Sequence, residues 1–163
     1  MRWRRWLLAG VGYLLVAGIV GLSAAAGWFY WDRVQTRGEQ AARAVLPELA
    51  AREIPEVFAY DYQTVERSLA EAYPLLTPDY RQEFQKSANT QIIPEAKKRE
   101  VVVQANVVGV GVMSAKRDSA SVMVYLNRTV TDKSRQPLYD GSRLRVDFKR
   151  IGEKWLIAYI TPI

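Results

Sequence analysis

A carboxylate stands between two phenols at Tyr60-Asp61-Tyr62. A carboxylate beside tyrosine hydroxyls in an apolar cavity can abstract a proton, because burial makes the acid more basic and the phenols supply hydrogen bonds. The structural interpretation is that Asp61 caps the helix that follows, while Tyr60 and Tyr62 pack at a helix junction. We favour the structural interpretation, because neighbours in sequence need not converge on one cavity.

The residue types that are missing exclude several kinds of chemistry. The chain has no histidine and no cysteine. Ser–His and Cys–His nucleophile pairs, zinc sites built on these ligands and disulfide frameworks are therefore excluded. Carboxylate, tyrosine or lysine chemistry remains open. We predict a protein that is not an enzyme and that uses no cofactor and no metal ion.

A second group of candidate residues lies between residues 143 and 149, where charged and apolar residues alternate. Alternation places Arg143, Arg145, Asp147 and Lys149 on one face of a half-exposed strand. The basic residues could contact an acidic partner or lipid headgroups, and a solvated sheet face is the simpler interpretation. An ion pair between Arg145 and Asp147 would contribute well under about 1 kcal/mol.

Three further residues, Asn127, Asp140 and Trp155, are candidates for partner contact or for lining a cavity. Asn127 is predicted first to form a polar pair across neighbouring strands. Trp155 is predicted first to pack against the sheet or the core. Asp140 belongs to Tyr139-Asp140-Gly141-Ser142, a sequence typical of a turn.

The N-terminus carries the signal of a membrane anchor. Arg2, Arg4 and Arg5 precede residues 7–31, which are 25 residues without a charge and end in four aromatic residues. A helix rising about 1.5 Å per residue needs about 20 residues to cross a bilayer. By the positive-inside rule the arginines stay in the cytoplasm. We predict a single span in the plasma membrane, with everything after it outside the cytoplasm.

A cleaved signal peptide is the alternative, because Ala24-Ala25-Ala26 offers the small residues of a cleavage site. The apolar segment is longer than the usual signal-peptide core of about 7–15 residues, which favours an uncleaved anchor. Small residues let helices approach closely in lipid, so Gly10, Gly18 and Gly21 are candidates for a packing face within the span.

The basic charge of the chain does not predict nucleic-acid binding. Three of the 23 basic residues precede the apolar segment and all 17 acidic residues follow it, so the exported part carries a net charge of only +3. The signs are interleaved there, without the blocks of like charge that favour nucleic acid.

The periodicity of apolar residues predicts helices first and strands afterwards. Residues 32–56 are predicted to be helical, with a kink or a division into two segments at Pro47 and Pro55. Two more helices are predicted between residues 64 and 93, the first starting at Thr64 and the second at Thr77. Four strands follow from Val101 onward. A bend, a bulge or a close backbone contact is expected at Gly109 and Gly111, and a hairpin turn at Gly152-Glu153-Lys154 leads to the last strand. This order favours an α+β fold in which helices pack on one face of a curved antiparallel sheet.

Several short strings in this order match one known family. The strings lie at residues 58–62, 101–103, 111–114, 124–127 and 140–146, with Trp155-Leu156 near the C-terminus. Behind one N-terminal apolar segment, they make the chain resemble the Mce-associated membrane proteins of actinobacteria. In this family Asn127 is more often followed by glutamine, where this chain has Arg128.

The resemblance implies a domain plan. Residues 1–6 would be a cytoplasmic basic tail, residues 7–31 the transmembrane signal anchor, residues 32–56 a juxtamembrane helical segment, and residues 57–163 an exported NTF2-like, or cystatin-like, domain.

The resemblance also implies a function: an accessory or stabilising subunit of an Mce complex, which moves lipids or sterols across the cell envelope. Its partners would be Mce subunits or permeases, together with membrane lipids around the anchor, and a homo-oligomer stays open. One alternative is a small-molecule binder or enzyme that uses the cavity of an NTF2-like domain with Asp61. Another is an assembly subunit of a secretion system, similar to the VirB8 family.

Overall fold

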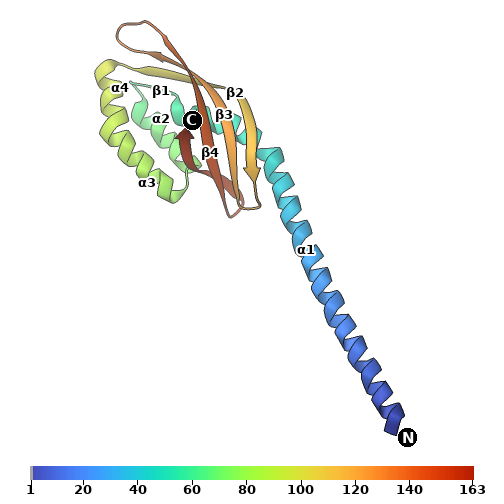
Figure 1. The fold of residues 1–163 in the computed structure, drawn as a ribbon. Coiled ribbons are helices and arrows are strands. Elements are labelled where there is room, and N and C mark those ends of the chain that lie inside the picture. Colours follow the sequence, from blue (N-terminus) through green and yellow to red (C-terminus); the bar gives the residue numbers. More distant parts are fainter. Residues whose placement is uncertain (1) are drawn as a thin grey trace. The chain divides into compact units, whose positions relative to one another are not determined.

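Helix α1, Arg2–Phe58, forms the N-terminal part of the chain in the computed structural model (Figure 1). The structure describes the backbone of residues 2–163, and the side-chain environment of residues 21–23, 28, 33–34 and 36–163. The chain divides into two compact units, Met1–Arg37 and Gly38–Ile163. Helix α1 begins in the first unit and ends in the second.

The predicted membrane span at residues 7–31, with Gly10 and Gly18, lies largely outside the residues whose side chains are described, so it stays a prediction. Within the described residues, no helical stretch combines the length and the apolar character needed to cross a bilayer. A Cβ atom added at Gly21 would meet nothing within 4 Å.

The part of α1 after Gly38 belongs to the core of the second unit. Its side chains at every fourth position, Ala42, Leu46, Ala50 and Ile54, are at most 1% exposed. This spacing makes a continuous apolar stripe along one side of a helix. Residues 38–56 of the segment predicted to lie beside the membrane are thus a structural part of the second unit.

Of the two outcomes predicted for Pro47 and Pro55, a division into two helical segments is wrong, because α1 continues through both prolines. A proline inside a helix removes one backbone hydrogen bond and costs ~3 kcal/mol. The buried stripe packs on both sides of Pro47, and burial of several aliphatic side chains at ~2 kcal/mol each offsets this cost.

Short helical segments follow the strand β1, Tyr60–Asp61. They are α2 (Val65–Ala72), a 3₁₀ turn (Tyr73–Leu75), α3 (Pro78–Ser87), a π-helical turn (Ala88–Ile92) and α4 (Ile93–Arg99). Thr64 and Thr77 stand at the predicted helix starts, but neither side chain makes a capping hydrogen bond. Pro94 lies in the first turn of α4, directly after the π-helical turn, so its missing N–H falls where the helical hydrogen-bond pattern changes.

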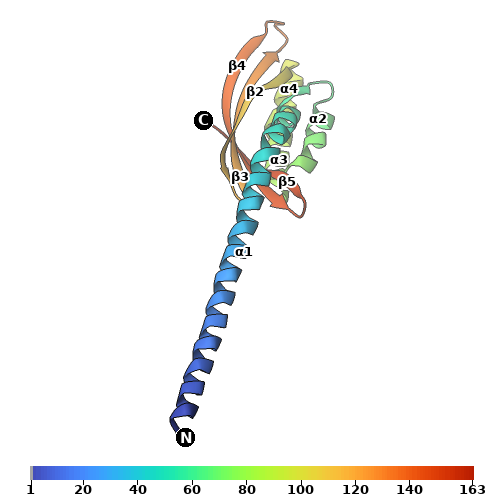
Figure 2. The ribbon, with the colours of Figure 1, turned by 90° about the vertical axis from the view of Figure 1, so that its right-hand side faces the viewer.

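The sheet has five antiparallel strands that neighbour one another in sequence order. They are β1 (Tyr60–Asp61), β2 (Val102–Ala115), β3 (Ser119–Thr131), β4 (Leu138–Ile151) and β5 (Lys154–Pro162). The helices of the second unit lie on one side of this curved sheet (Figures 1 and 2). The α+β prediction is confirmed, and β1 is a strand that periodicity did not predict.

The face of the sheet toward the helices, called the inner face below, carries the apolar core. Val122, Val124 and Leu126 of β3 and Val146 and Phe148 of β4 are buried there with the stripe of α1. Successive strand residues point to opposite faces, so the residues between these form the outer face, which is more exposed. The alternation predicted for residues 143–149 is thus confirmed.

Two predictions about turns have opposite outcomes. Tyr139-Asp140-Gly141-Ser142 is not a turn but part of β4, because its residues continue the pairing with β3 as far as Leu138. The predicted turn at Gly152 joins β4 to β5, and Gly152 has a φ of 63°, which glycine adopts without the strain that a side chain adds.

Candidate functional site

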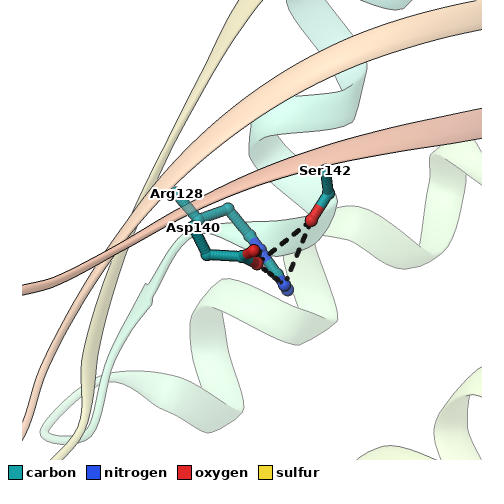
Figure 3. Close-up of polar contacts among 3 residues, drawn as sticks. All are labelled: Arg128, Asp140 and Ser142. Atoms are coloured by element: carbon teal, nitrogen blue, oxygen red, sulfur yellow. Dashed lines mark hydrogen bonds and ion pairs between the residues drawn. The ribbon is translucent and has the colours of Figure 1, made fainter.

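An ion pair between Arg128 and Asp140 lies on the inner face of the sheet, where an apolar pair would be expected. The two residues are direct partners across β3 and β4. The Arg128 Nε donates to Asp140 Oδ2 at 3.1 Å, and Nη2 contacts the same oxygen. Ser142 Oγ donates to Asp140 Oδ2 at 3.0 Å and lies 3.5 Å from Arg128 Nη2 (Figure 3).

The end of α1 adds an aromatic contact to this pair. The guanidinium carbon of Arg128 lies 5.9 Å from the centre of the Phe58 ring, within the range of a cation–π interaction. Arg128 therefore connects α1 to the sheet as well as β3 to β4. Hydrogen bonds from Arg128 and then Ser142 hold the pKa of Asp140 below its usual value. Asp140 is thus a carboxylate at neutral pH.

A cavity of about 590 Å³ adjoins the ion pair. Its size lies in the range of about 300–1,000 Å³ that is usual for small-molecule sites. Apolar side chains from the helices and the sheet make most of its wall, among them Val57, Phe58, Leu69, Phe84, Ile92, Val103 and Val130. Its polar lining residues are Tyr60, Glu95, Arg99, Arg128, Tyr139 and Asp140.

A second cavity of about 220 Å³ shares Val57, Phe58, Phe84 and Arg128 with the first. Ser142 and Leu144 of β4 and Ile160 of β5 complete its wall. Arg128 therefore lines both cavities.

This arrangement favours binding over acid–base catalysis. A general base works best when its pKa lies near the working pH. The pKa of Asp140 is lowered instead, and its carboxylate is already bound to a guanidinium. The groups present are a fixed donor and acceptor beside an apolar cavity.

The predicted group Tyr60-Asp61-Tyr62 does not converge on one point. Tyr60 lines the cavity, and burial raises its pKa against the opposing charge of Arg128. Asp61 Oδ1 instead accepts a hydrogen bond from the Gln63 backbone N–H at 2.8 Å, in the turn before α2. The Tyr62 hydroxyl accepts from Gln63 Nε2 at 3.1 Å. Strand geometry sends Tyr60 and Asp61 to opposite faces.

The predicted polar residues of the sheet lie mainly on the outer face. Asn127 stands opposite Asn106 in β2 and opposite Gly141 in β4. Arg145 Nε donates to Asp147 Oδ1 at 3.1 Å, which is the predicted ion pair.

Two other predicted residues lie apart from the ion pair. Arg143 is exposed on the outer face, opposite Tyr125 of β3. Trp155 is partly buried and packs against the core.

Sequence reasoning missed Arg128, although a signal was present. The inner face of β3 carries Val122, Val124, Leu126, Arg128 and Val130. A single cation in such a stripe indicates a paired charge or a polar point in a cavity. The pairing of Arg128 with Asp140 depends on the register between β3 and β4, and the sequence analysis placed Asp140 in a turn.

Comparison with known proteins gives a distant relationship. No family model matches the chain. The chain is 27% identical over 163 residues to the outer membrane protein Rv1973 of Mycobacterium tuberculosis, and the alignment covers 100% of both chains. The chain is a distant homologue of this mycobacterial protein.

Solved structures share the fold of the second unit. An IcmL-like type IV secretion system protein from Legionella pneumophila superposes with a TM-score of 0.62 at 16% identity, over 74% of this chain and 93% of that one. The VirB8 protein of Agrobacterium tumefaciens superposes with a TM-score of 0.53 at 11% identity, over 68% of this chain and 84% of that one. At these identities the likeness concerns the fold alone.

Proposed function

We propose that the chain is a non-enzymatic accessory subunit of an Mce-type lipid or sterol import complex in the cell envelope. Residues 7–31 would anchor it in the plasma membrane, and the domain outside the cytoplasm would dock onto other subunits. The observation that carries the proposal is the full-length similarity to a mycobacterial protein named as an outer membrane protein. The uncharged N-terminal segment supports the anchor, and the resemblance to the Mce-associated family supports the accessory role.

A secretion-system assembly subunit is the second candidate, and the fold is the observation that favours it. Some of the solved structures that share the fold belong to proteins named as type IV secretion system components. Both candidates act by docking without chemistry, so the proteins that co-purify distinguish them.

The outer face of the sheet is the surface we propose for docking, since the helices of the second unit cover only the inner face (Figure 2). Tyr125 of β3 stands opposite Arg143 of β4, and Arg145 follows on the same face. Tyrosine and arginine are the residue types that contribute most at protein interfaces. We call Arg143, Arg145, Asp147 and Lys149 on the outer face of β4 the strip. The strip has three positive charges and the one negative charge of Asp147, which suits an acidic partner surface.

The experiment is a pull-down of the tagged full chain from native membranes in mild detergent, with mass spectrometry of the proteins that co-purify. We expect Mce subunits, permeases or their ATPase. Recovery should be lost when the domain is deleted and should weaken when an unrelated span replaces residues 7–31. Recovery of secretion components would favour the second candidate. Recovery of the bait alone, while other membrane complexes survive the detergent, would contradict both.

A charge reversal tests the docking surface in the same assay. Arg143→Glu places a negative charge on the strip, and we expect it to reduce partner recovery about tenfold or more, because like charges at an interface cost several kcal/mol. The matched control is Arg67→Glu on α2, where Arg67 has a side chain 74% exposed. Equal losses in both variants would assign the effect to net charge and not to the outer face.

A further inference from the structure

The cavity beside Arg128 and Asp140 has a mostly apolar wall. Leu69 and Phe84 from the helices and Val103 and Val130 from the sheet line it, and their side chains are hydrocarbon. Such a wall gains from contact with a hydrocarbon body, because apolar surface leaves water.

The charges around the cavity cancel. Arg128 is bound to Asp140, and Glu95 and Arg99 bring one charge of each sign. Arg99 is also held by Asp132 at 2.9 Å. An anion entering the cavity would meet the Asp140 carboxylate, and a cation would meet Arg128. The lining therefore favours an uncharged molecule.

The ion pair leaves one donor and one acceptor for a ligand. Within the part of the chain that the structure describes, the hydrogen bonds of the pair use Nε and Nη2 of Arg128 and Oδ2 of Asp140 (Figure 3). Nη1 of Arg128 and Oδ1 of Asp140 take part in none of them. A hydroxyl group donates and accepts at once, so it can use both atoms.

We propose that this cavity binds a neutral amphiphile, an apolar hydrocarbon body with a hydroxyl head, and that Arg128 and Asp140 hold the hydroxyl. Leu138, which lines the cavity and is 67% exposed, gives it an apolar rim through which such a molecule enters. The proposal concerns the inner face of the sheet and stands independently of docking by the outer face.

The first test uses the full chain in lipid nanodiscs and a photoreactive probe, hexadecanol bearing a diazirine in its chain. After irradiation, labelled peptides are mapped by mass spectrometry. We expect labels on cavity residues such as Leu69, Ile92 and Val130. Labels confined to residues 7–31 would show contact with the bilayer alone and would overturn the proposal.

A cavity-filling variant tests whether the labelling depends on the cavity. Val130→Phe adds bulk to the cavity wall, and we expect at least a several-fold loss of label. The matched control is Val108→Phe, because Val108 is 57% exposed and lies away from this lining. Thermal unfolding confirms that both variants fold, and Val103→Phe provides a second filling position if Val130→Phe does not. Equal labelling of a folded filling variant and the control would overturn the proposal.

The head group is tested with a hexadecanoic acid probe that carries the same diazirine. The wild-type chain should favour the alcohol. In Asp140→Asn the repelling carboxylate is gone while Arg128 keeps its charge, so labelling by the acid relative to the alcohol should rise about tenfold. A wild-type preference for the acid, or an unchanged ratio in Asp140→Asn, would contradict the assigned role of the pair.

Discussion

Glu53 is an acidic residue inside the core, and replacing its carboxyl group by an amide should stabilise the folded protein in a pH-dependent way. The residue is 7% exposed on α1, and its Oε2 has no hydrogen-bond partner in the described part of the chain. Desolvation by burial is the largest influence and raises the pKa of Glu53 from 4.5 to about 7, against the weaker opposing attraction of Arg52.

The sign of the effect follows from the direction of this shift. Between pH 4.5 and pH 7 the folded state holds a proton that the unfolded state has lost, so stability falls as pH rises through this window. Because one unit of pKa shift corresponds to about 1.4 kcal/mol, the stability that Glu53 costs the folded state at high pH has an upper limit of ~3 kcal/mol. We expect Glu53→Gln to gain about 2 kcal/mol more at pH 8 than at pH 5, because its amide stays uncharged at both.

Urea unfolding of the full chain in detergent, followed by circular dichroism at the two pH values, measures this difference. Each variant is compared with the wild type at the same pH, so the effects of pH on other groups cancel. Glu48→Gln, an exposed position on the same helix, is the matched control and should change little. A gain for Glu53→Gln that is equal at pH 5 and pH 8, or a loss at pH 8, would refute the reasoning.

Three further substitutions test the fold and the turn at Asp61. Leu46→Ala should lower the free energy of unfolding by about 2–5 kcal/mol, because Leu46 is fully buried. Val45→Ala, at the half-exposed neighbouring position, should change it by under about 1 kcal/mol, and urea unfolding compares the two variants. Gly152→Ala should cost about 1 kcal/mol or more in the same assay because of its positive φ, and a gain would contradict the turn geometry. Asp61→Asn keeps an acceptor for the Gln63 N–H, so both stability and partner recovery should be retained; loss of partner recovery with unchanged stability would give Asp61 a role in docking.

The order of helices and strands was predictable because the spacing of apolar residues and the residue types that favour turns are local properties of the sequence. The alternation at residues 143–149 and the turn at Gly152 both carry their signal within a few residues. One of the two bulges in β2 falls beside Gly109, where a bend or bulge was expected, and the other falls between Val112 and Ser114. Each of these features is decided by neighbours in the sequence.

The predictions that failed concern long-range pairing. Tyr139-Asp140-Gly141-Ser142 has the composition of a turn, and only its pairing with β3 makes it a strand. Pro47 normally ends a helix, but the buried stripe around it depends on a sheet formed much later in the chain. Tertiary packing outweighs local propensity in both cases.

The candidate site shows the same limit. Tyr60 and Asp140 were singled out from the sequence and do line one cavity. Arg128, which joins them to Phe58 and Ser142, was missed because its partners are 12 or more residues away and depend on the register. The grouping of Tyr60 with Asp61 failed because β1 turns the two side chains apart.

The most direct measurement for the central claim is site-specific photo-crosslinking in the native host. A photo-crosslinking amino acid replaces Tyr125 on the outer face of the sheet, and in a second strain it replaces Arg67 on α2. The account predicts crosslinks from position 125 to an Mce subunit or permease, and none to such a protein from position 67. Crosslinks from position 67 alone, or from position 125 only to unrelated proteins, would contradict it.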